Sequence, residues 1–558
     1  MLDGAARVGE LLDEAARLEM PALAVTDHGN MFGAFEFYKH ARARGIRPLI
    51  GVEAYLTPGT SRFERRRVRW GNGGPDDVSG GGAYTHVTML AETTEGMHNL
   101  FRLSSLASME GQFYKPRMDR ELLERYHRGI LATTGCPSGE VQTLLRLGKY
   151  DEALASAAYY RDLFGADSYF VELMDHGLAI ERRVRTDLLR IAKDLALPLV
   201  ATNDLHYTRQ QDAVGHDALL CVQSGSTMND ADRFSFDGDG YYLKTAEEMR
   251  EVFRELPEAC DNTLLVAERC EVSFTVGRDL MPRFPVPEGE TEETLFLKRV
   301  EDGLRRRYPN GLSAEARERA DHETSTILQM GFPGYFLVTA DLIMWAKAQG
   351  IRVGPGRGSA TGAIVSYAMG ITELDPLEHG LLFERFLNPE RVSMPDIDID
   401  FDERRRSEVM CYVTEKYGED RVSQVVTYGT IKAKQALKDA SRVLGYPFAM
   451  GERITKAMPA SVMGKDIPLA GIFERGHSRH GEATELRALY DSDDDVKKIV
   501  DTARQLENLK RQWGVHACAV ILSREPLLDV IPLLKREQDG AIITQFDYPT
   551  CETLGLLK

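Results

Sequence analysis

Three aspartates alternate with isoleucines in the run Asp396-Ile397-Asp398-Ile399-Asp400. In an extended strand successive side chains point to opposite faces, so the carboxylates would share one face while the isoleucines are buried on the other. Carboxylates crowded on one face repel one another unless a cation lies between them. Mg²⁺ prefers such oxygen ligands and leaves positions for phosphate and water. The run therefore predicts a magnesium site, and a solvated acidic edge strand is the alternative.

A glycine turn, residues Gly354–Gly362, precedes these aspartates and lies between an expected strand at 351–354 and an expected helix from Ala363. Its backbone N–H groups and the helix N-terminus could hold a phosphate, with a positive charge from Arg357 and a hydroxyl from Ser359. The turn is not a Walker motif, because no lysine follows its last glycine. Taken alone it could be purely structural. Beside the acidic run it predicts a triphosphate site next to a metal.

A second group of potential metal ligands lies in the first part of the chain, each at or near the end of an expected strand: Asp27, His28, Glu53, His86, Cys136, Asp204 and His206. A single buried histidine is usually structural. Several such residues on the carboxyl face of a barrel indicate a metal site instead, and this mixture of imidazole, carboxylate and thiolate suits Zn²⁺ or Mn²⁺ rather than Mg²⁺.

The elements that would position these ligands alternate between helices and short apolar strands up to about residue 265. After a helix over 8–18, strands are expected just before His28 and at 46–55, 85–90, 130–136, 169–174 and 197–206. Repeated βα units predict a parallel sheet or barrel, whose chemistry would lie at the carboxyl ends of the strands. The segment 61–82, an arginine run followed by many glycines, is expected to be a mobile insertion outside the core.

The second part of the chain predicts a helix over 335–348, a strand at 396–401, mostly helix from 403 to 507, and strands at 519–522 and 542–546. Lys434, Lys438 and Arg442 recur every four residues and would share one helix face, with Lys432 just before them. A solvated face is the usual meaning of such a charge run.

Composition limits the number of domains, the mode of nucleic-acid binding and the location of the protein only broadly. A chain of 558 residues suggests three or four domains, and a net charge of −17 argues against a protein that coats nucleic acid over its whole surface. Seven scattered cysteines favour a reducing compartment, and we expect a cytoplasmic protein. The start of the chain does not resemble a secretory signal, and no apolar stretch reaches the ~18 residues of a membrane helix.

Several longer motifs of the sequence resemble those of a known protein family. The run from Leu382 to Asp400, together with Gly354–Ser359, Gly331–Phe336 and Val515–Ala517, resembles the palm of the alpha subunits of bacterial replicative DNA polymerase III. The motifs of the first part resemble the polymerase-and-histidinol-phosphatase (PHP) domain of that family, a (β/α)7 barrel. The resemblance implies an α/β multidomain chain: a PHP domain over 1–265, a nucleotidyltransferase-type mixed palm sheet over 266–427 and 511–558, and a helical thumb inserted over 428–510.

The resemblance also implies a function, DNA-directed DNA polymerase acting through two Mg²⁺ ions. Asp396 and Asp398 match the family's metal ligands, and Asp400 is their neighbour. The positions that match the nucleotide site are Arg357, Gly358, Ser359, His516 and Lys558. In the thumb, the basic residues Lys432, Lys434, Lys438 and Arg442 would follow the duplex backbone. The three arginines at 404–406 could contact primer or triphosphate, or pair with carboxylates, and the sequence leaves both open.

Asp3 matches a further PHP ligand and completes the N-terminal ligand set: Asp3, His28, Glu53, His86, Cys136, Asp204 and His206. In relatives this site either removes mispaired 3′ ends, as a 3′–5′ exonuclease, or only stabilises the polymerase. The family's His-x-His strand would precede Met1 and its third palm aspartate would follow Lys558, so we expect a fragment with weak or no activity as it stands.

Expected partners are primer–template DNA, deoxynucleoside triphosphates and, through a missing C-terminal part, a sliding clamp and other replisome subunits; no membrane partner is expected. Two alternatives remain open. One is a PHP-type metal-dependent phosphoesterase, whose activity would survive removal of the second part. The other is a DNA-binding replication scaffold, which would tolerate loss of Asp396 and Asp398.

Overall fold

The computed structural model describes residues 1–390 and 395–558, so four residues of the Leu382–Asp400 run lie outside the described residues. Contacts divide the chain into two compact units. The first unit comprises Met1–Phe274, Val426–His516 and Ile531–Asp547, and the second comprises Thr275–Val425, Ala517–Val530 and Tyr548–Lys558. The predicted division at residues 265, 427 and 510 stays a prediction.

The first unit is built on a mixed sheet with the strand order β4-β5-β2-β3-β6-β7-β8, and β1 pairs with β2. Its strands are β1 (Ala22–Val25), β2 (Arg47–Leu56), β3 (Thr85–Ala91), β4 (Gln112–Phe113), β5 (Lys115–Met118), β6 (Ile130–Thr133), β7 (Tyr169–Leu173) and β8 (Leu199–Ala201). The expected strands are all present, but the sheet is mixed, because β3 runs antiparallel to both β2 and β6. The link from β2 to β3 contains only the four-residue helix α3 (Ser79–Gly82) and so lacks the long crossover helix that parallel neighbours need. The number of barrel strands stays a prediction.

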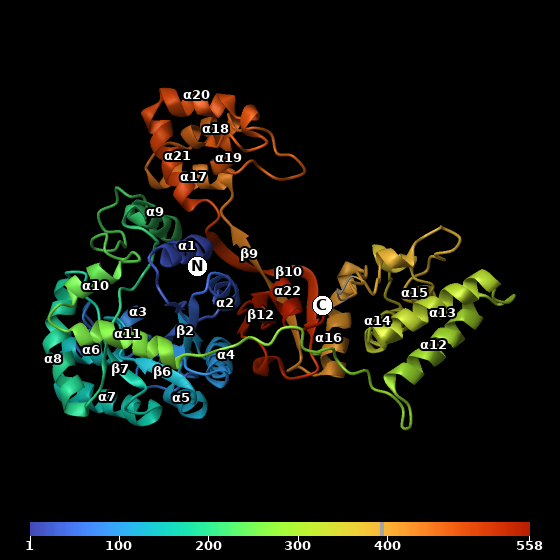
Figure 1. The fold of residues 1–558 in the computed structure, drawn as a ribbon, viewed down its shortest axis with the longest axis horizontal. Helices are drawn as coiled ribbons and strands as arrows, with labels where there is room; N and C mark the ends of the chain where they lie inside the picture. The colour runs from blue at the N-terminus through green and yellow to red at the C-terminus, as the bar shows by residue number, and fades with distance from the viewer. Residues whose placement is uncertain (391–394) are drawn as a thin grey trace. The chain divides into compact units, whose positions relative to one another are not determined.

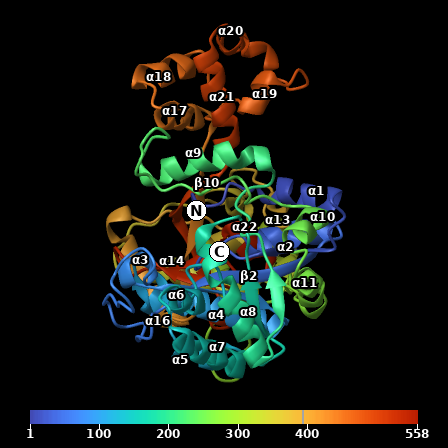
Figure 2. The same ribbon diagram turned by 90° about the vertical axis from the view of Figure 1, so that its left-hand side faces the viewer.

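Helices of the first unit pack around this sheet (Figures 1 and 2). They are α1 (Val8–Arg17), α2 (Ala34–Ala43), α4 (Thr94–Glu110), α5 (Arg120–Tyr126), α6 (Glu140–Arg146), α7 (Tyr150–Phe164), α8 (Ala179–Leu195), α9 (Ala213–Ser224), α10 (Ala246–Val252) and α11 (Pro257–Arg269). Side-chain caps fix several starts: Thr93 accepts a hydrogen bond from the Gly96 N–H at α4, and Asp119 accepts one from the Leu122 N–H at α5.

The segment 61–82 is anchored at two buried charges, contrary to the expectation that it lies outside the core. Arg62, 6% exposed, forms an ion pair with Asp119 at 3.0 Å. Asp77, also 6% exposed, accepts hydrogen bonds from three backbone N–H groups of residues 70–73. The first contact ties the start of the arginine run to Asp119, and the second folds the end of the segment onto itself.

A bundle of short helices completes the first unit: α17 (Ala433–Val443), α18 (Phe448–Lys456), α19 (Leu469–Phe473), α20 (Thr484–Ser492) and α21 (Asp494–Leu506) (Figure 1). Its apolar core includes residues of α9, and Leu2 and Ala5 from the start of the chain pack against it. The expected helical stretch from 403 to 507 is interrupted by strand β9 (Val422–Thr430), a run rich in valine and threonine that favours extended structure.

A four-stranded sheet has the order β10-β9-β12-β11, with β10 at Lys510–Leu522, β11 at Leu533–Lys535 and β12 at Ile542–Asp547. β10 is thirteen residues long, so the strand expected at 519–522 is only its end. The boundary between the two units falls within β9 and within β10.

The second unit contains α12 (Glu292–Arg307), α13 (Ala314–Gln329), α14 (Pro333–Ala348), α15 (Ile364–Ala368), α16 (Arg406–Tyr417) and α22 (Tyr548–Thr553). The expected strands at 351–354 and 396–401 reduce to one isolated bridge, between Val353 and Phe401, because Ile397 and Ile399 pack against the helical core rather than beside a partner strand. Within residues 1–390 and 395–558, no single helix is both long and apolar enough to cross a membrane. Helices α13 and α14 reach that length and composition only when taken together, and they are bent by 112° relative to each other.

Candidate functional site

The carboxyl edge of the first sheet collects the N-terminal ligand set. His28 follows β1 and forms a parallel bridge with Glu53 in β2. His86 begins β3, where it stands opposite Tyr55 near the end of β2. Because β3 is antiparallel to β2, the start of β3 lies at the same edge as the end of β2, and this reversal brings His86 to the other ligands.

Glu53 joins two histidines of the set. Its Oε1 lies 2.8 Å from His86 Nδ1 and its Oε2 lies 3.6 Å from His28 Nδ1. The Sγ atom of Cys136, which follows β6, lies 3.4 Å from His86 Nδ1.

Asp3 reaches the opposite side of His28. Its Oδ2 is 3.2 Å from His28 Nε2 and 3.8 Å from His206 Nε2. The N–H groups of Ala5 and Ala6 donate to the carbonyl of His206, which fixes this segment beside the strand ends. His206 Nδ1 lies 2.7 Å from the carbonyl oxygen of Asp204, an arrangement that leaves Nε2 to face Asp3.

These side chains fit a metal ion. The ligand atoms of Asp3, His28 and His206 lie within 4.8 Å of one another, and so do those of His28, Glu53 and His86. The Nδ1 atom of His28 is buried and has no hydrogen-bond partner in the structure, an arrangement that costs free energy unless a ligand binds there. The mixture of nitrogen, carboxylate and thiol donors suits zinc or manganese.

The pKa shifts of this cluster show which protons a metal ion would have to displace. Burial alone would raise the pKa of Asp3, but the hydrogen bond with His206 and the charge of His28 hold it below its usual range. Burial alone would lower the pKa of His206, but its contact with Asp3 raises it to about 9. Burial, together with the charge of Glu53, raises the pKa of the Cys136 thiol, so a metal would have to displace that proton to gain a thiolate ligand.

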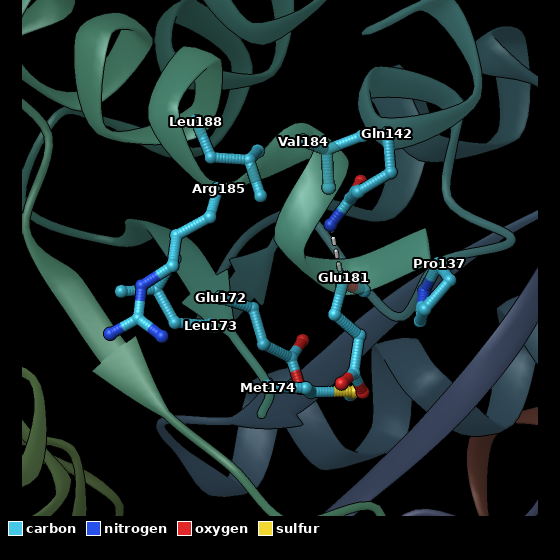
Figure 3. A pocket seen from close by; sticks show the side chains of 10 residues that line it. Pro137, Gln142, Glu172, Leu173, Met174, Glu181, Val184, Arg185 and Leu188 are labelled. Atoms are coloured by element: carbon cyan, nitrogen blue, oxygen red, sulfur yellow. Dashed lines mark hydrogen bonds between the residues drawn. The ribbon is translucent and has the colours of Figure 1, made fainter. Parts of the chain in front are cut away.

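Three neighbouring carboxylates have partners within the protein. Asp27 turns away from the ligand set, since its Oδ2 accepts the Gly33 N–H at 3.0 Å. Glu172 and Glu181, both buried, line a small pocket between β7 and α8 (Figure 3). Burial raises the pKa of Glu172 to about 7, and Glu181 Oε1 lies 2.7 Å from His176 Nδ1. Neither pocket carboxylate therefore extends the metal cluster.

The acidic run of the second unit is held by its backbone. The Ile397 N–H donates to the hydroxyl of buried Tyr335 at 2.9 Å, and the Gly354 N–H donates to the Asp400 carbonyl at 2.8 Å. The isoleucines are partly buried, whereas the aspartates at 396, 398 and 400 are exposed. The predicted alternation is present, although the segment is not a paired strand.

Two cations neutralise these aspartates. Lys558 Nζ lies 3.2 Å from Asp396 Oδ1, and Arg357 lies 3.5 Å from Asp398 and 3.4 Å from Asp400. Exposed pairs of this kind contribute at most about 1 kcal/mol each, so a divalent ion can displace them. Among the described residues the aspartates do not form a cluster of three ligand atoms within 4.8 Å. The oxygen donors nevertheless suit Mg²⁺.

The glycine turn lies beside the acidic run. Gly358 has a φ of +69°, Thr361 Oγ1 donates to its carbonyl at 2.8 Å, and residues 359–362 form a single 3-10 turn. The helix expected from Ala363 is the five-residue α15, too short for a strong helix dipole. Arg357, Gly358 and Ser359 are all exposed, so a phosphate would depend mainly on the arginine and the backbone of the turn.

The arginines at 404–406 have local partners, and their contact with primer or triphosphate stays a prediction. Arg404 pairs with Asp402 at 2.7 Å, Arg405 pairs with Glu408 at 2.7 Å, and Arg406 donates to the Ala517 carbonyl.

The positive charge of helix α17 is partly neutralised by partners within the first unit. Lys434 pairs with Asp466 at 2.8 Å, Lys438 pairs with Glu452 at 2.6 Å, and Arg442 donates to the Gly225 carbonyl at 3.1 Å. Lys432 is exposed at the start of the helix, and His516 is half-buried in β10. Their roles stay predictions.

Both parts of the chain match the models of known protein families. Residues 1–176 match the family model of the PHP domain, and residues 294–558 match that of the bacterial DNA polymerase III alpha NTPase domain. The chain carries a PHP domain followed by a bacterial DNA polymerase III alpha NTPase domain. The expected family is thereby confirmed, as is the α/β multidomain class.

Relatives named DNA polymerase III subunit alpha match the whole chain. The protein of Mycobacterium tuberculosis strain H37Rv is 59% identical over 566 residues and that of Thermus aquaticus is 41% identical over 619. The chain spans 48% and 49% of these two relatives, about half their length. A solved putative metal-dependent phosphoesterase from Bifidobacterium adolescentis, 15% identical, covers 45% of this chain and 92% of its own, with a TM-score of 0.22.

Three functional positions of the PHP and polymerase domains were missed from the sequence. Tyr335, which holds the backbone at Ile397, lies in the Gly331–Phe336 motif, and that motif was the available signal. Tyr55 stacks on His28 with ring centroids 5.8 Å apart, and Tyr84 stacks on His86 at 5.7 Å. Tyr55 follows the ligand Glu53 by two positions on β2, a spacing that puts both side chains on one face.

Proposed function

We propose that this chain forms the PHP, palm and thumb parts of a DNA-directed DNA polymerase that adds deoxynucleotides to a primer 3′ end by two-metal-ion phosphoryl transfer. The PHP part comprises residues 1–265, the palm 266–427 and 511–558, and the thumb 428–510. The observation that carries the proposal is the pairing of Asp396 and Asp398, exposed on one side of an anchored segment, with the displaceable cations Lys558 and Arg357.

Each residue has a distinct task in this proposal. Two Mg²⁺ ions at Asp396 and Asp398 would lower the pKa of the attacking 3′-hydroxyl and neutralise the leaving pyrophosphate. Lys558 and Arg357, released from the carboxylates, then bind triphosphate oxygens. Gly358 and Ser359 would offer backbone and hydroxyl donors to the same phosphates, and His516 is proposed to bind the nucleotide as well. Tyr335 holds the acidic segment in place through the Ile397 N–H.

Binding of a deoxynucleoside triphosphate to the 558-residue chain tests this assignment. Isothermal titration should show affinity that rises with Mg²⁺ and is lost in Asp396→Asn and in Asp398→Asn. Asp400→Asn is the matched control, since this exposed carboxylate also contacts Arg357 but is not a proposed ligand. Binding that is independent of Mg²⁺, or equal loss in all three variants, would contradict the proposal.

The PHP domain is proposed to be a metal-dependent phosphoesterase that acts on DNA 3′ ends as a proofreading exonuclease, with Zn²⁺ or Mn²⁺ held by Asp3, His28, Glu53, His86, Cys136, Asp204 and His206. The buried His28 Nδ1, which has no hydrogen-bond partner and lies 3.6 Å from Glu53, favours this second activity. In an enzyme of the relatives' full length, hydrolysis of a mismatched primer with added Mn²⁺ should be lost in His86→Ala and retained in Asp398→Asn, whereas the 558-residue chain alone should show weak or no hydrolysis. Hydrolysis that survives His86→Ala would refute it.

The proposed partners are primer–template DNA, held in part by Lys432, Lys434, Lys438 and Arg442, and a sliding clamp with other replisome subunits. The proposed location is the cytoplasm, where bacterial DNA is copied. A DNA-binding scaffold, the competing function, would bind DNA but show no Mg²⁺-dependent nucleotide affinity.

A further inference from the structure

The hairpin β4–β5 carries an exposed aromatic ring in an unusual backbone conformation. Tyr114, between the two strands, has a φ of +64° and a side chain that is 58% exposed. Glycine or asparagine is the usual residue at such a left-handed turn position, and a bulky side chain there is strained. Strain of this kind collects at functional positions.

The arginine run is fixed beside this hairpin. Arg67 donates to the Tyr114 hydroxyl at 2.6 Å, and its guanidinium carbon lies 4.9 Å from the ring centroid. The fully buried Arg117 of β5 donates to the Glu64 carbonyl at 2.8 Å, which ties the backbone of the run to the hairpin. The exposed arginines are Arg65, Arg66, Arg67 and Arg69. Positive charge and an aromatic surface are therefore held together.

Aromatic rings connect this surface to the metal ligands. Lys115, next to Tyr114, places its Nζ 5.4 Å from the Tyr55 ring. Tyr55 stacks on His28 and lies 4.9 Å from Tyr84, which stacks on His86. These contacts place Lys115 of the hairpin close to the PHP ligand set, with the buried ring of Tyr55 between them.

We propose that Tyr114, Arg67 and Lys115 bind single-stranded DNA and lead its 3′ end to the PHP ligand set. The inference rests on the proposed phosphoesterase function. Proteins that bind single strands combine basic groups, which follow the phosphates, with rings on which bases stack, and this surface offers both. An acidic peptide would use the charges but gain little from the exposed ring, and it has no phosphodiester for the neighbouring ligand set.

Fluorescence anisotropy of a short labelled oligothymidylate with the 558-residue chain in EDTA tests binding apart from hydrolysis. Tyr114→Gly is the informative variant, because glycine adopts a positive φ freely and the hairpin should fold at least as well. We expect about tenfold weaker binding, the loss of about 1.4 kcal/mol, from removal of one stacking ring. Arg67→Gln should weaken binding and reduce its salt dependence.

A matched control is the pair Arg190 and Tyr150, whose guanidinium carbon and ring centroid lie 4.1 Å apart on α8 and α7. Arg190→Gln with Tyr150→Phe should leave affinity unchanged. Wild-type affinity in both Tyr114→Gly and Arg67→Gln, or equal competition by polyglutamate, would overturn the proposal. His86→Ala should bind the oligonucleotide as tightly as the unaltered chain. Failure of the exonuclease is distinguished by the hydrolysis assay on the full-length enzyme, which does not depend on this binding measurement.

Discussion

Arg7 links the start of the chain to the end of a helix almost five hundred positions later, and its removal should loosen that helix. Its guanidinium donates to the carbonyls of Gln505 and Glu507, both at 2.7 Å, and to that of Arg504 at 3.3 Å. These carbonyls lie in and just after the last turn of α21, where helical partners are lacking. Arg7 thus acts as a C-terminal cap that also brings positive charge to the helix dipole.

The size of the effect follows from these contacts. Charge-assisted hydrogen bonds contribute about 1.5–3 kcal/mol, and a cation at a helix C-terminus about 0.3–1 kcal/mol. The Arg7 side chain is 27% exposed, so water would replace part of what is lost. We therefore expect Arg7→Met, which retains most of the apolar stem, to destabilise this region by about 2 kcal/mol, or about thirtyfold in opening equilibrium.

Native-state hydrogen exchange measures this opening directly. Amides at the end of α21 should exchange about thirtyfold faster in Arg7→Met, while those of β7 should not change. The control is Arg17→Met, which removes a 66%-exposed arginine paired with Glu14 and should leave both regions unaltered. Unchanged protection of α21 in Arg7→Met would refute the capping argument.

Three further predictions follow from individual contacts. Tyr335→Phe should lower the free energy of unfolding by about 1–2 kcal/mol, because the Ile397 N–H loses its acceptor. The same variant should weaken Mg²⁺-dependent nucleotide binding. Unchanged nucleotide affinity would show that this hydrogen bond does not position the aspartates. In metal-free protein, the urea midpoint of unfolding should fall as pH rises from about 6.5 to about 9. Asp3 raises the pKa of His206 from its ordinary 6.5 to about 9, so the folded state loses the stabilising proton over this range. Asp3→Asn should flatten this pH dependence, and a midpoint that rises with pH would contradict the prediction. Glu452→Gln should free Lys438 and give tighter, more salt-dependent DNA binding, whereas unchanged titrations would place α17 away from DNA.

Sequence periodicity predicted the parts of the fold that depend on local pattern. The alternation of Asp396, Ile397 and Asp398 determines which side chains are exposed, and it holds even though the segment is not a paired strand, because the isoleucines still bury against the helical core. The strand that precedes His28 and the strands that carry Glu53 and His86 were likewise expected, since each is a short apolar run.

Contacts between distant segments could not be predicted in this way. The reversal of β3 depends on how the link after β2 folds back, and the acceptor for the Ile397 N–H comes from Tyr335, on a separate helix. Likewise, the pairing of Lys438 with Glu452 turns a basic stripe into a partly neutralised surface, which the spacing of lysines on one helix cannot reveal.

The central claim is that Asp396 and Asp398 bind divalent ions for an incoming nucleotide. Anomalous diffraction from crystals of this chain grown with Mn²⁺ and a non-hydrolysable deoxynucleoside triphosphate tests it most directly. The account predicts a manganese peak between these two carboxylates, with Lys558 and Arg357 turned toward the triphosphate. Manganese confined to the PHP ligand set, with both ion pairs of the palm intact, would contradict it.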